Sequence, residues 1–190
     1  IYGMIEAGPI LTVNTNMDKP TSIGTTLSNI SISLMNGDKL LTEEQTGEIC
    51  VVSSILTEDL HKLMNDKFQN GWYHTGDLGR LDPDGYLYFV DRKTYVINVR
   101  GFEVYPEQVE MALMKHPMIR DVVVAGVPKD EYSEAIHAHI IQEEGKRPSD
   151  EELVTFLEKE LARYQIPEKF IYVNHFPKSP TGKVVRQALK

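Results

Sequence analysis

The most informative segment of the sequence is YLYFVDRKTYVINVRGFEVYPEQVEMAL at residues 86–113, because the residue pattern changes within it. Its first five residues, Tyr86–Val90, form an aromatic and apolar run that is typical of a β-strand. Pro106 then stands where the first residue of a helix is expected, and apolar residues follow it at helical spacing. The segment therefore predicts a β-rich piece before it and a mixed domain after it.

Upstream of this segment, short strands and turns alternate. Apolar and polar residues alternate over residues 30–34, as in a half-buried strand, and a second apolar run follows at residues 49–52. Residues 82–85 read Asp-Pro-Asp-Gly, a tight-turn sequence that predicts a hairpin. The spacing of the apolar residues at 60–64 predicts a short helix over this sheet.

Downstream, strand and helix patterns are mixed. Residues 122–124, 136–140 and 170–173 are typical of strands, and Ser149 followed by Glu152 is a capping box that predicts a helix. We therefore expect an α+β fold: a β-rich part at residues 1–91, then a small mixed α/β domain at residues 92–190 with a central sheet of about three strands. A hinge is expected near residues 91–95.

The composition is that of an ordinary globular protein. The chain has 190 residues, 41% hydrophobic and 25% charged, which excludes the disordered, collagen-like and disulfide-rich classes. No apolar run approaches the roughly 20 residues that a membrane-spanning helix needs. The single cysteine, Cys50, can form neither an internal disulfide nor a cysteine-based zinc site, so we expect a reducing, cytoplasmic location.

Charge is distributed unevenly along the chain. The net charge of −8 argues against nucleic acid as a general partner, because phosphate binding requires a basic face. Residues 1–90 carry 5 basic and 12 acidic side chains, whereas residues 161–190 carry six basic side chains and one acidic side chain. The basic end is either a solvated tail or a segment that approaches an anionic small molecule, and composition leaves both interpretations open.

Four short stretches could carry chemistry, and the first of them is Tyr2-Gly3-Met4-Ile5-Glu6-Ala7. In Thr75-Gly76-Asp77 the glycine can set a turn that presents the Asp77 carboxylate, an acceptor suited to a vicinal diol such as ribose. Arg92 ends a predicted strand and offers a rigid fork of donors for hydroxyls or phosphate. Lys183 follows Thr181-Gly182 and places a positive charge on a loop. Each stretch by itself is common in unrelated proteins.

These and other motifs occur in a characteristic order along the chain: Tyr2-Gly3-Met4-x-Glu6, Thr46-Gly47-Glu48-Ile49, Gly71-Trp72-Tyr73-x-Thr75-Gly76-Asp77, Gly85-Tyr86-Leu87, Asp91-Arg92-Lys93, Arg100-Gly101-Phe102-x-Val104-Tyr105-Pro106 with Glu110, and Pro180-Thr181-Gly182-Lys183. In this order they resemble the C-terminal part of the adenylate-forming superfamily, which includes acyl- and aryl-CoA synthetases, peptide-synthetase adenylation domains and beetle luciferases. The resemblance covers nearly the whole chain.

The resemblance implies a nucleotide site and a catalytic lysine. Members of the superfamily activate a carboxylic acid with ATP and Mg²⁺ and then usually transfer the acyl group to a thiol such as CoA. By similarity, Tyr2 would stack on adenine, Glu6 would help to hold the magnesium ion, and Asp77 and Arg92 would contact the ribose. Lys183 would reach the α-phosphate and the substrate carboxylate and would neutralise charge that develops in the transition state.

The resemblance also implies a moving domain. Arg100 and Gly101 would belong to the face presented to CoA in the second half-reaction, and the small domain would rotate about a hinge at Thr94 to exchange the two faces. The sequence departs from the family pattern at Ile5, where a phosphate-contacting threonine is usual, and at the hinge positions Thr94 and Tyr95. Asn98 likewise stands where many relatives carry lysine.

Three hypotheses follow from the resemblance. In the first, the chain is a fragment, inactive by itself, of an ATP-dependent carboxylic acid–CoA ligase; the form of residues 104–110 favours the CoA synthetases. In the second, the acceptor is the phosphopantetheine thiol of a carrier protein. In the third, Ile5, Thr94 and Tyr95 mark a degenerate member that acts as a binding module.

The remaining polar candidates have simpler interpretations. His137 and His139 alternate on a predicted strand with no third ligand nearby in the sequence, so no metal site is expected there. We interpret His74 as a packing or surface residue and Cys50 as a core residue.

Overall fold

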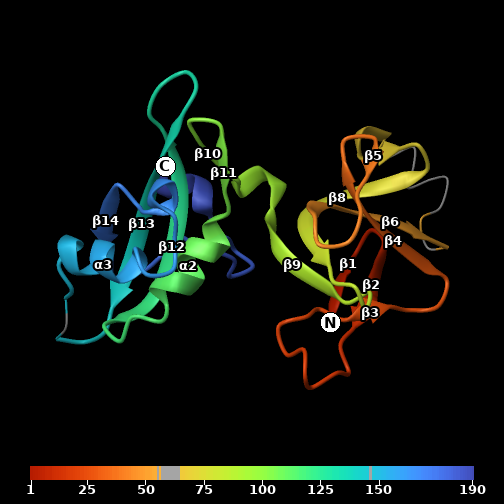
Figure 1. Cartoon of the computed structure of the whole chain (residues 1–190), viewed down its shortest axis with the longest axis horizontal. Coiled ribbons are helices and arrows are strands. Elements are labelled where there is room, and N and C mark those ends of the chain that lie inside the picture. The colour runs from red at the N-terminus through yellow and green to blue at the C-terminus, as the bar shows by residue number, and fades with distance from the viewer. Residues whose placement is uncertain (55, 57–64, 146) are drawn as a thin grey trace. The chain divides into compact units, whose positions relative to one another are not determined.

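The computed structural model describes residues 1–54, 56, 65–145 and 147–190, and these form two compact units (Figure 1). Unit 1 is Ile1–Thr94 and unit 2 is Tyr95–Lys190. The described part of the chain holds no helix with the length and apolar character needed to cross a membrane. That the protein bends near residues 91–95 stays a prediction.

Unit 1 is built from antiparallel strands. Its larger sheet has the order β5-β4-β6-β8-β7, and β9 also pairs with β8. Its smaller sheet has the order β1-β2-β3. The elements of unit 1 are β1 (Tyr2–Met4), β2 (Gly8–Val13), β3 (Thr25–Thr26), β4 (Ile30–Asn36), β5 (Lys39–Leu40), β6 (Thr46–Ser53), β7 (Phe68–Gln69), β8 (Trp72–Leu81), β9 (Leu87–Arg92), the short 3₁₀ helix η1 (Asn65–Lys67), and most of η2 (Lys93–Tyr95).

The strands predicted at residues 30–34, 49–52 and 86–90 correspond to β4, β6 and β9. Side chains from these strands form the core of unit 1, in which Ile49 and Leu87 are almost fully buried. The helix predicted from residues 60–64 lies outside the described residues.

The predicted turn between β8 and β9 is present and is held by one carboxylate. Asp82 Oδ1 accepts hydrogen bonds from the backbone N–H groups of Asp84 and Tyr86 at 3.0 and 2.9 Å. Lys19 Nζ donates to Asp82 Oδ2 at 2.6 Å, and this hydrogen bond lowers the pKa of Asp82 to about 2. The turn that leads to Arg92 is therefore fixed by local hydrogen bonds and by a charge from the distant β2–β3 connection.

The prediction of a turn at Thr75-Gly76-Asp77 is wrong. The three residues lie inside β8, which pairs with β6 on one side and with β9 on the other. The register between β6 and β8 shifts between Glu48 and Cys50, opposite this tripeptide, and Gly76 has a φ of 77°. The glycine therefore permits an irregular bulge within the sheet instead of reversing the chain.

Unit 2 contains a three-stranded sheet with the order β12-β13-β14 and a separate hairpin of β10 and β11. Strands β12 and β13 are antiparallel, whereas β13 and β14 are parallel. The elements of unit 2 are β10 (Ile97–Val99), β11 (Phe102–Val104), α2 (Pro106–Leu113), β12 (Ile119–Pro128), β13 (Glu134–Gln142), α3 (Asp150–Leu157), β14 (Lys169–Tyr172), and the 3₁₀ helices η3 (Arg163–Gln165) and η4 (Arg186–Leu189).

One face of the unit 2 sheet carries the core. The helices α2 and α3 cover this face (Figure 1). Alternate residues of β12 and β13 belong to the core between the sheet and the helices. Leu113 of α2 and Leu153 of α3 are completely buried in the cluster. The predicted alternation at residues 136–140 is thus confirmed, with His137 and His139 on the opposite face. The observed fold is the expected strand-rich α+β arrangement with a three-stranded central sheet.

The predicted start of α3 is also confirmed. Ser149 is the N-cap residue, and its Oγ accepts a hydrogen bond from the backbone N–H of Glu152 at 3.1 Å. This bond satisfies one of the backbone donors that a helix start leaves without an intrahelical partner.

We predict that Ser149→Ala lowers the free energy of unfolding by about 1 kcal/mol, because the cap is lost. Ser149→Asp is the matched control, since aspartate also accepts at this position and should retain most of the stability. Denaturant unfolding followed by circular dichroism measures both variants. An equal loss in the two variants would contradict this role of the side chain.

Candidate functional site

The structure brings Tyr2, Asp77 and Arg92 together in unit 1. Asp77 in β8 lies directly opposite Arg92 in β9, and Arg92 Nε is 3.1 Å from Asp77 Oδ1. Tyr2 comes from β1 and donates its hydroxyl hydrogen to Asp77 Oδ2 at 2.9 Å. Three of the residues that the sequence proposes for a nucleotide site are therefore linked through the Asp77 carboxylate.

Asp77 keeps an acceptor oxygen that its neighbours cover in this structure. The residue is only 5% exposed, and within the described residues its Oδ1 has an ion-pair partner but no hydrogen-bond donor. A buried carboxylate oxygen without a donor is costly, and a ligand hydroxyl would supply one. The Arg92 side chain is 57% exposed, so its remaining N–H groups are accessible to the same ligand.

Tyr2 acts here through its hydroxyl group. Burial, followed by the charge of Asp77, raises the pKa of Tyr2 well above its ordinary value. The phenol therefore stays protonated and remains a donor to Asp77 at physiological pH. Stacking of the Tyr2 ring on adenine stays a prediction.

Glu6 lies in the turn between β1 and β2 and is half-buried. Within the described residues it makes no hydrogen bond or ion pair, and these residues contain no cluster of three potential metal ligands. A magnesium ion is commonly held by one or two carboxylates together with substrate phosphates, so a single free carboxylate fits that mode. Ile5 beside it is 96% exposed and offers no polar group to a phosphate.

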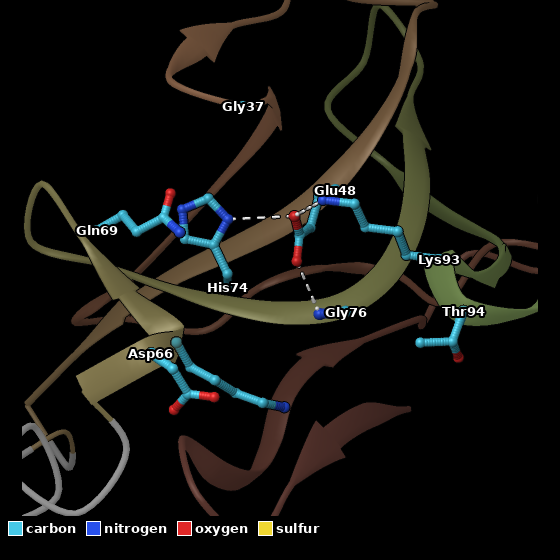
Figure 2. Close-up of a pocket in the computed structure, with 9 residues that line it drawn as sticks. Gly37, Glu48, Asp66, Gln69, His74, Gly76, Lys93 and Thr94 are labelled. Atoms are coloured by element: carbon cyan, nitrogen blue, oxygen red, sulfur yellow. Dashed lines mark hydrogen bonds and ion pairs between the residues drawn. The ribbon is translucent and has the colours of Figure 1, made fainter.

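A second cluster surrounds the buried carboxylate of Glu48 in β6 (Figure 2). Glu48 Oε1 accepts from the backbone N–H of Gly76 at 3.0 Å, and Oε2 accepts from Lys93 Nζ at 2.9 Å. His74 Nδ1 lies 3.2 Å from the same Oε2. Glu48 thus connects the bulge that precedes Asp77 with the residue that precedes Thr94.

The electrostatics of Glu48 follow from these contacts. Burial raises the pKa of its carboxyl group, but the hydrogen bonds from Lys93 and His74 outweigh burial and hold the pKa below its ordinary value. Glu48 therefore stays ionised at physiological pH and keeps all three contacts. Sequence reasoning assigned no role to Glu48, although the Thr46-Gly47-Glu48 motif belongs to the resemblance.

A cavity of about 340 Å³ opens beside this cluster and is lined by Glu48, His74, Gly76, Lys93 and Thr94, among others (Figure 2). His74 is buried, and its Nδ1 lies 3.4 Å from Cys50 Sγ. Burial, followed by the charge of Glu48, raises the pKa of the Cys50 thiol to about 12. The interpretation of Cys50 as a core residue is confirmed, and its thiol is not a nucleophile at neutral pH.

Lys183 lies in unit 2 on a closed loop. The backbone N–H of Ser179 donates to Lys183 O at 2.8 Å, and the N–H of Lys183 donates to Ser179 Oγ at 3.2 Å. The Lys183 side chain is exposed, and Gly182 has a φ of 83° that allows the tight turn. The meeting of Lys183 with the residues of unit 1 stays a prediction.

Arg100 and Gly101 form the turn of the β10–β11 hairpin. Both have positive φ, 52° and 88°, and the backbone N–H of Arg100 donates to Ser133 Oγ at 3.2 Å. Beside this turn is a cavity of about 650 Å³ within unit 2, which includes the stacked rings of Phe102 and Tyr164. The lining also carries the cationic side chains of Arg100 and Arg163, together with Lys129 and Glu168, which form an ion pair with each other. The expected thiol face is thus a concave, aromatic and basic surface.

We predict that Glu48→Gln destabilises unit 1 by about 1–2 kcal/mol at neutral pH, since the ion pair with the half-exposed Lys93 is lost. The pKa of Glu48 is lowered on folding, so its contribution is complete above its ordinary value of 4.5 and disappears as the pH falls through the folded-state value. The stability difference from wild type should therefore narrow below pH 4.5.

Thermal or denaturant unfolding between pH 3 and 8 measures this difference. Glu43→Gln is the control, because Glu43 is exposed and should produce no such pH dependence. A difference that is constant over the whole range would contradict the role given to the ionised carboxylate.

The chain is similar to known proteins in both sequence and structure. Residues 108–183 match the family of the AMP-binding enzyme C-terminal domain. The chain is 32% identical to 4-coumarate–CoA ligase 3 of Oryza sativa subsp. japonica over 201 residues, covering 100% of the chain and 36% of the relative. It is 34% identical to the long-chain-fatty-acid–CoA ligase of Escherichia coli O157:H7 over 197 residues, covering 100% of the chain and 35% of the relative.

Among solved structures, O-succinylbenzoate coenzyme A synthetase of Bacillus subtilis in complex with AMP superposes with a TM-score of 0.86 at 32% identity. This match covers 100% of the chain and 40% of the synthetase. The same enzyme in complex with ATP and magnesium ion matches with a TM-score of 0.80 at 32% identity, covering 91% of the chain and 36% of the synthetase.

The chain thus spans little more than a third of the curated relatives that it matches. The match to residues 108–183 lies entirely within unit 2, whereas the similarity to the ligases also includes unit 1 with Tyr2, Asp77 and Arg92. The chain belongs to the adenylate-forming superfamily and corresponds to the C-terminal part of its acyl- and aryl-CoA ligases.

Proposed function

We propose that the protein containing this chain is an ATP-dependent carboxylic acid–CoA ligase. The observation that carries the proposal is the buried Asp77 carboxylate, which is paired with Arg92 and Tyr2 and has one oxygen without a hydrogen-bond donor among the described residues. Such a carboxylate suits the two hydroxyls of a ribose. The relatives named as CoA ligases support this assignment.

The proposed reaction has two steps. In the first, a carboxylate oxygen of the acid attacks the α-phosphorus of ATP, the bond between the α-phosphorus and the bridging oxygen breaks, and pyrophosphate leaves. In the second, the thiol of CoA loses its proton to solvent and its sulfur attacks the acyl carbon. The carbon–sulfur bond forms, the bond from the acyl carbon to the phosphate oxygen breaks, and AMP leaves.

The residues of the chain divide between these steps. Asp77 and Arg92 bind the ribose, and Lys183 stabilises the negative charge that develops around the α-phosphorus. Glu6 helps to hold a magnesium ion, which neutralises phosphate charge when it is bound. Arg100 and Gly101 belong to the surface that meets CoA after the small domain has turned about Thr94.

The 190-residue chain is expected to be inactive by itself, because it spans little more than a third of the length of the ligases to which it is similar. The proposal therefore concerns the full-length protein, and a cytoplasmic location, suggested by the single cysteine in the sequence, belongs to the same proposal. CoA ligation and loading of a carrier protein differ in which thiol receives the acyl group from the adenylate.

We predict that Lys183→Ala in the full-length protein lowers the rate of adenylation at least about 100-fold, the loss typical when a transition-state charge partner is removed. Acid-dependent exchange between ATP and labelled pyrophosphate measures this step over a panel of carboxylic acids. Lys178→Ala is the matched control, since Lys178 is an exposed lysine at the start of the same loop and should leave exchange unchanged.

The outcomes separate the competing functions. Undiminished exchange in Lys183→Ala would remove the catalytic role of this lysine. Transfer from the adenylate to a purified carrier protein but not to CoA would change the acceptor. ATP binding without exchange for any acid would favour a degenerate member acting as a binding module.

We further predict that Asp77→Asn raises the KM for ATP about tenfold or more, because an amide accepts fewer hydrogen bonds than a carboxylate and leaves Arg92 without its charge partner. The measurement is the initial rate against ATP concentration. Asp18→Asn, a change at an exposed position in unit 1, should leave the KM unchanged. An unaltered KM in Asp77→Asn would place the ribose elsewhere.

A further inference from the structure

Glu110 and Arg186 in unit 2 form an ion pair that has no role in the proposed two-step reaction. Arg186 Nη2 donates to Glu110 Oε2 at 3.0 Å, and Nη1 donates to Glu110 Oε1. The side chains are only 18% and 15% exposed, and they are 76 residues apart in the sequence. A bidentate pair of this kind is both strong and directional, because the guanidinium is planar and rigid.

The pair is built into the edge of the sheet. Strand β12 has β13 as its only neighbour in the described sheet, so its other side leaves backbone groups open. The N–H of Val124 donates to Glu110 Oε1 at 2.7 Å, and Val124 O accepts from Arg186 Nη1 at 2.7 Å. The two side chains together satisfy the backbone N–H and C=O of Val124 on the open edge of β12. Both α2, which carries Glu110, and the C-terminal segment, which carries Arg186, are thereby attached to the same residue.

The loop that carries Lys183 depends on this point for its attachment. In the described part of the chain, the hydrogen bonds made by residues 178–184 all stay within the segment Pro177–Val185. Arg186, which directly follows this segment, is the first residue after it with a side chain bonded to the body of unit 2. On the other side of the loop, Phe176 is 5% exposed and anchors the chain by burial.

We propose that Glu110 and Arg186 form a positioning clamp for Lys183. This inference rests on the proposed function, in which Lys183 stabilises charge at the α-phosphorus. The loop behaves as a closed unit held at its two ends, so loss of the Arg186 attachment lets it turn about Phe176 without unfolding. A displacement of the Lys183 ammonium by about 1 Å is enough to weaken its action on the transition state strongly.

The same guanidinium also contacts the beginning of unit 2. The Arg186 guanidinium carbon lies 5.0 Å from the centroid of the Tyr95 ring, a cation–π arrangement. Tyr95 follows the expected hinge residue Thr94. The clamp therefore joins the lysine loop to the point at which the small domain begins, and a movement of that domain would carry the loop with it as one piece.

The test uses the full-length protein and the two half-reactions separately. Glu110→Gln keeps the shape of the side chain but removes its charge, and Arg186→Lys keeps the charge but removes the planar fork. Exchange of labelled pyrophosphate into ATP measures adenylation, and consumption of chemically prepared acyl-adenylate by CoA measures thioester formation. We expect both variants to lose adenylation about 10–100-fold, with thioester formation within about twofold of wild type.

Two further measurements distinguish positioning from stability. In a Lys183→Ala background, Glu110→Gln should cause no additional loss of adenylation, because the residue that it positions is already absent. Glu160→Gln removes another ion pair of unit 2, between Glu160 and Lys115, and should leave both half-reactions unchanged. Thermal unfolding of each variant shows whether unit 2 is folded at the assay temperature.

The outcomes are separable from those of the proposed function. Equal losses in both half-reactions, or an additional loss in the Lys183→Ala background, would overturn the clamp and assign the pair to general stability. Unchanged adenylation in both variants would also overturn it. Absence of adenylation in the wild-type protein would instead contradict the proposed function itself.

Discussion

The geometry of unit 1 depends on the burial of the Asp77 carboxylate between two strands. A carboxylate can be taken out of water only when other groups replace most of its hydration, and Arg92 and Tyr2 supply part of that replacement from β9 and β1. Their positions are fixed in turn by the pairing of β8 with β9 and by the pairing of β1 with β2. The contacts of Asp77 with Arg92 and Tyr2 therefore require both sheets of unit 1 to be correctly paired.

Glu48 connects the surroundings of Asp77 with the C-terminal end of unit 1. Its carboxylate holds the N–H of Gly76 on one side and the ammonium of Lys93 on the other. The bulge that presents Asp77 and the residue that precedes Thr94 thus share one buried charge. Unit 2 uses the same device, because the carboxylate of Glu110 holds a backbone N–H of β12 and the guanidinium of Arg186.

Local patterns predicted the regular elements well. The alternation at residues 30–34 and 136–140, the Asp-Pro-Asp-Gly turn, Pro106 at the start of α2 and the cap at Ser149 each depend on neighbours within a few residues. The bulge at Gly76 escaped prediction, because a glycine at positive φ can reverse a chain or remain in a strand. Only the pairing of β8 on both sides decides between the two.

The site was predictable only in part, for the same reason. Motif order marked Tyr2, Asp77 and Arg92, but their contacts join positions up to 75 residues apart. Glu48 meets Lys93 across 45 residues and Glu110 meets Arg186 across 76, and no periodicity in the sequence reports such pairs. The residues of the site could be recognised from motifs, but which of them are in contact is decided by the pairing of distant strands.

The buried thiol of Cys50 has a practical consequence for following movement in this protein. Its side chain is fully enclosed and burial raises the pKa of its thiol to about 12, so at neutral pH it reacts far more slowly with maleimides or iodoacetamide than an exposed cysteine does. A cysteine placed at an exposed position of each unit would therefore be labelled selectively, without removal of the natural one. Energy transfer between two such dyes could then report directly whether, and by how much, unit 2 turns relative to unit 1.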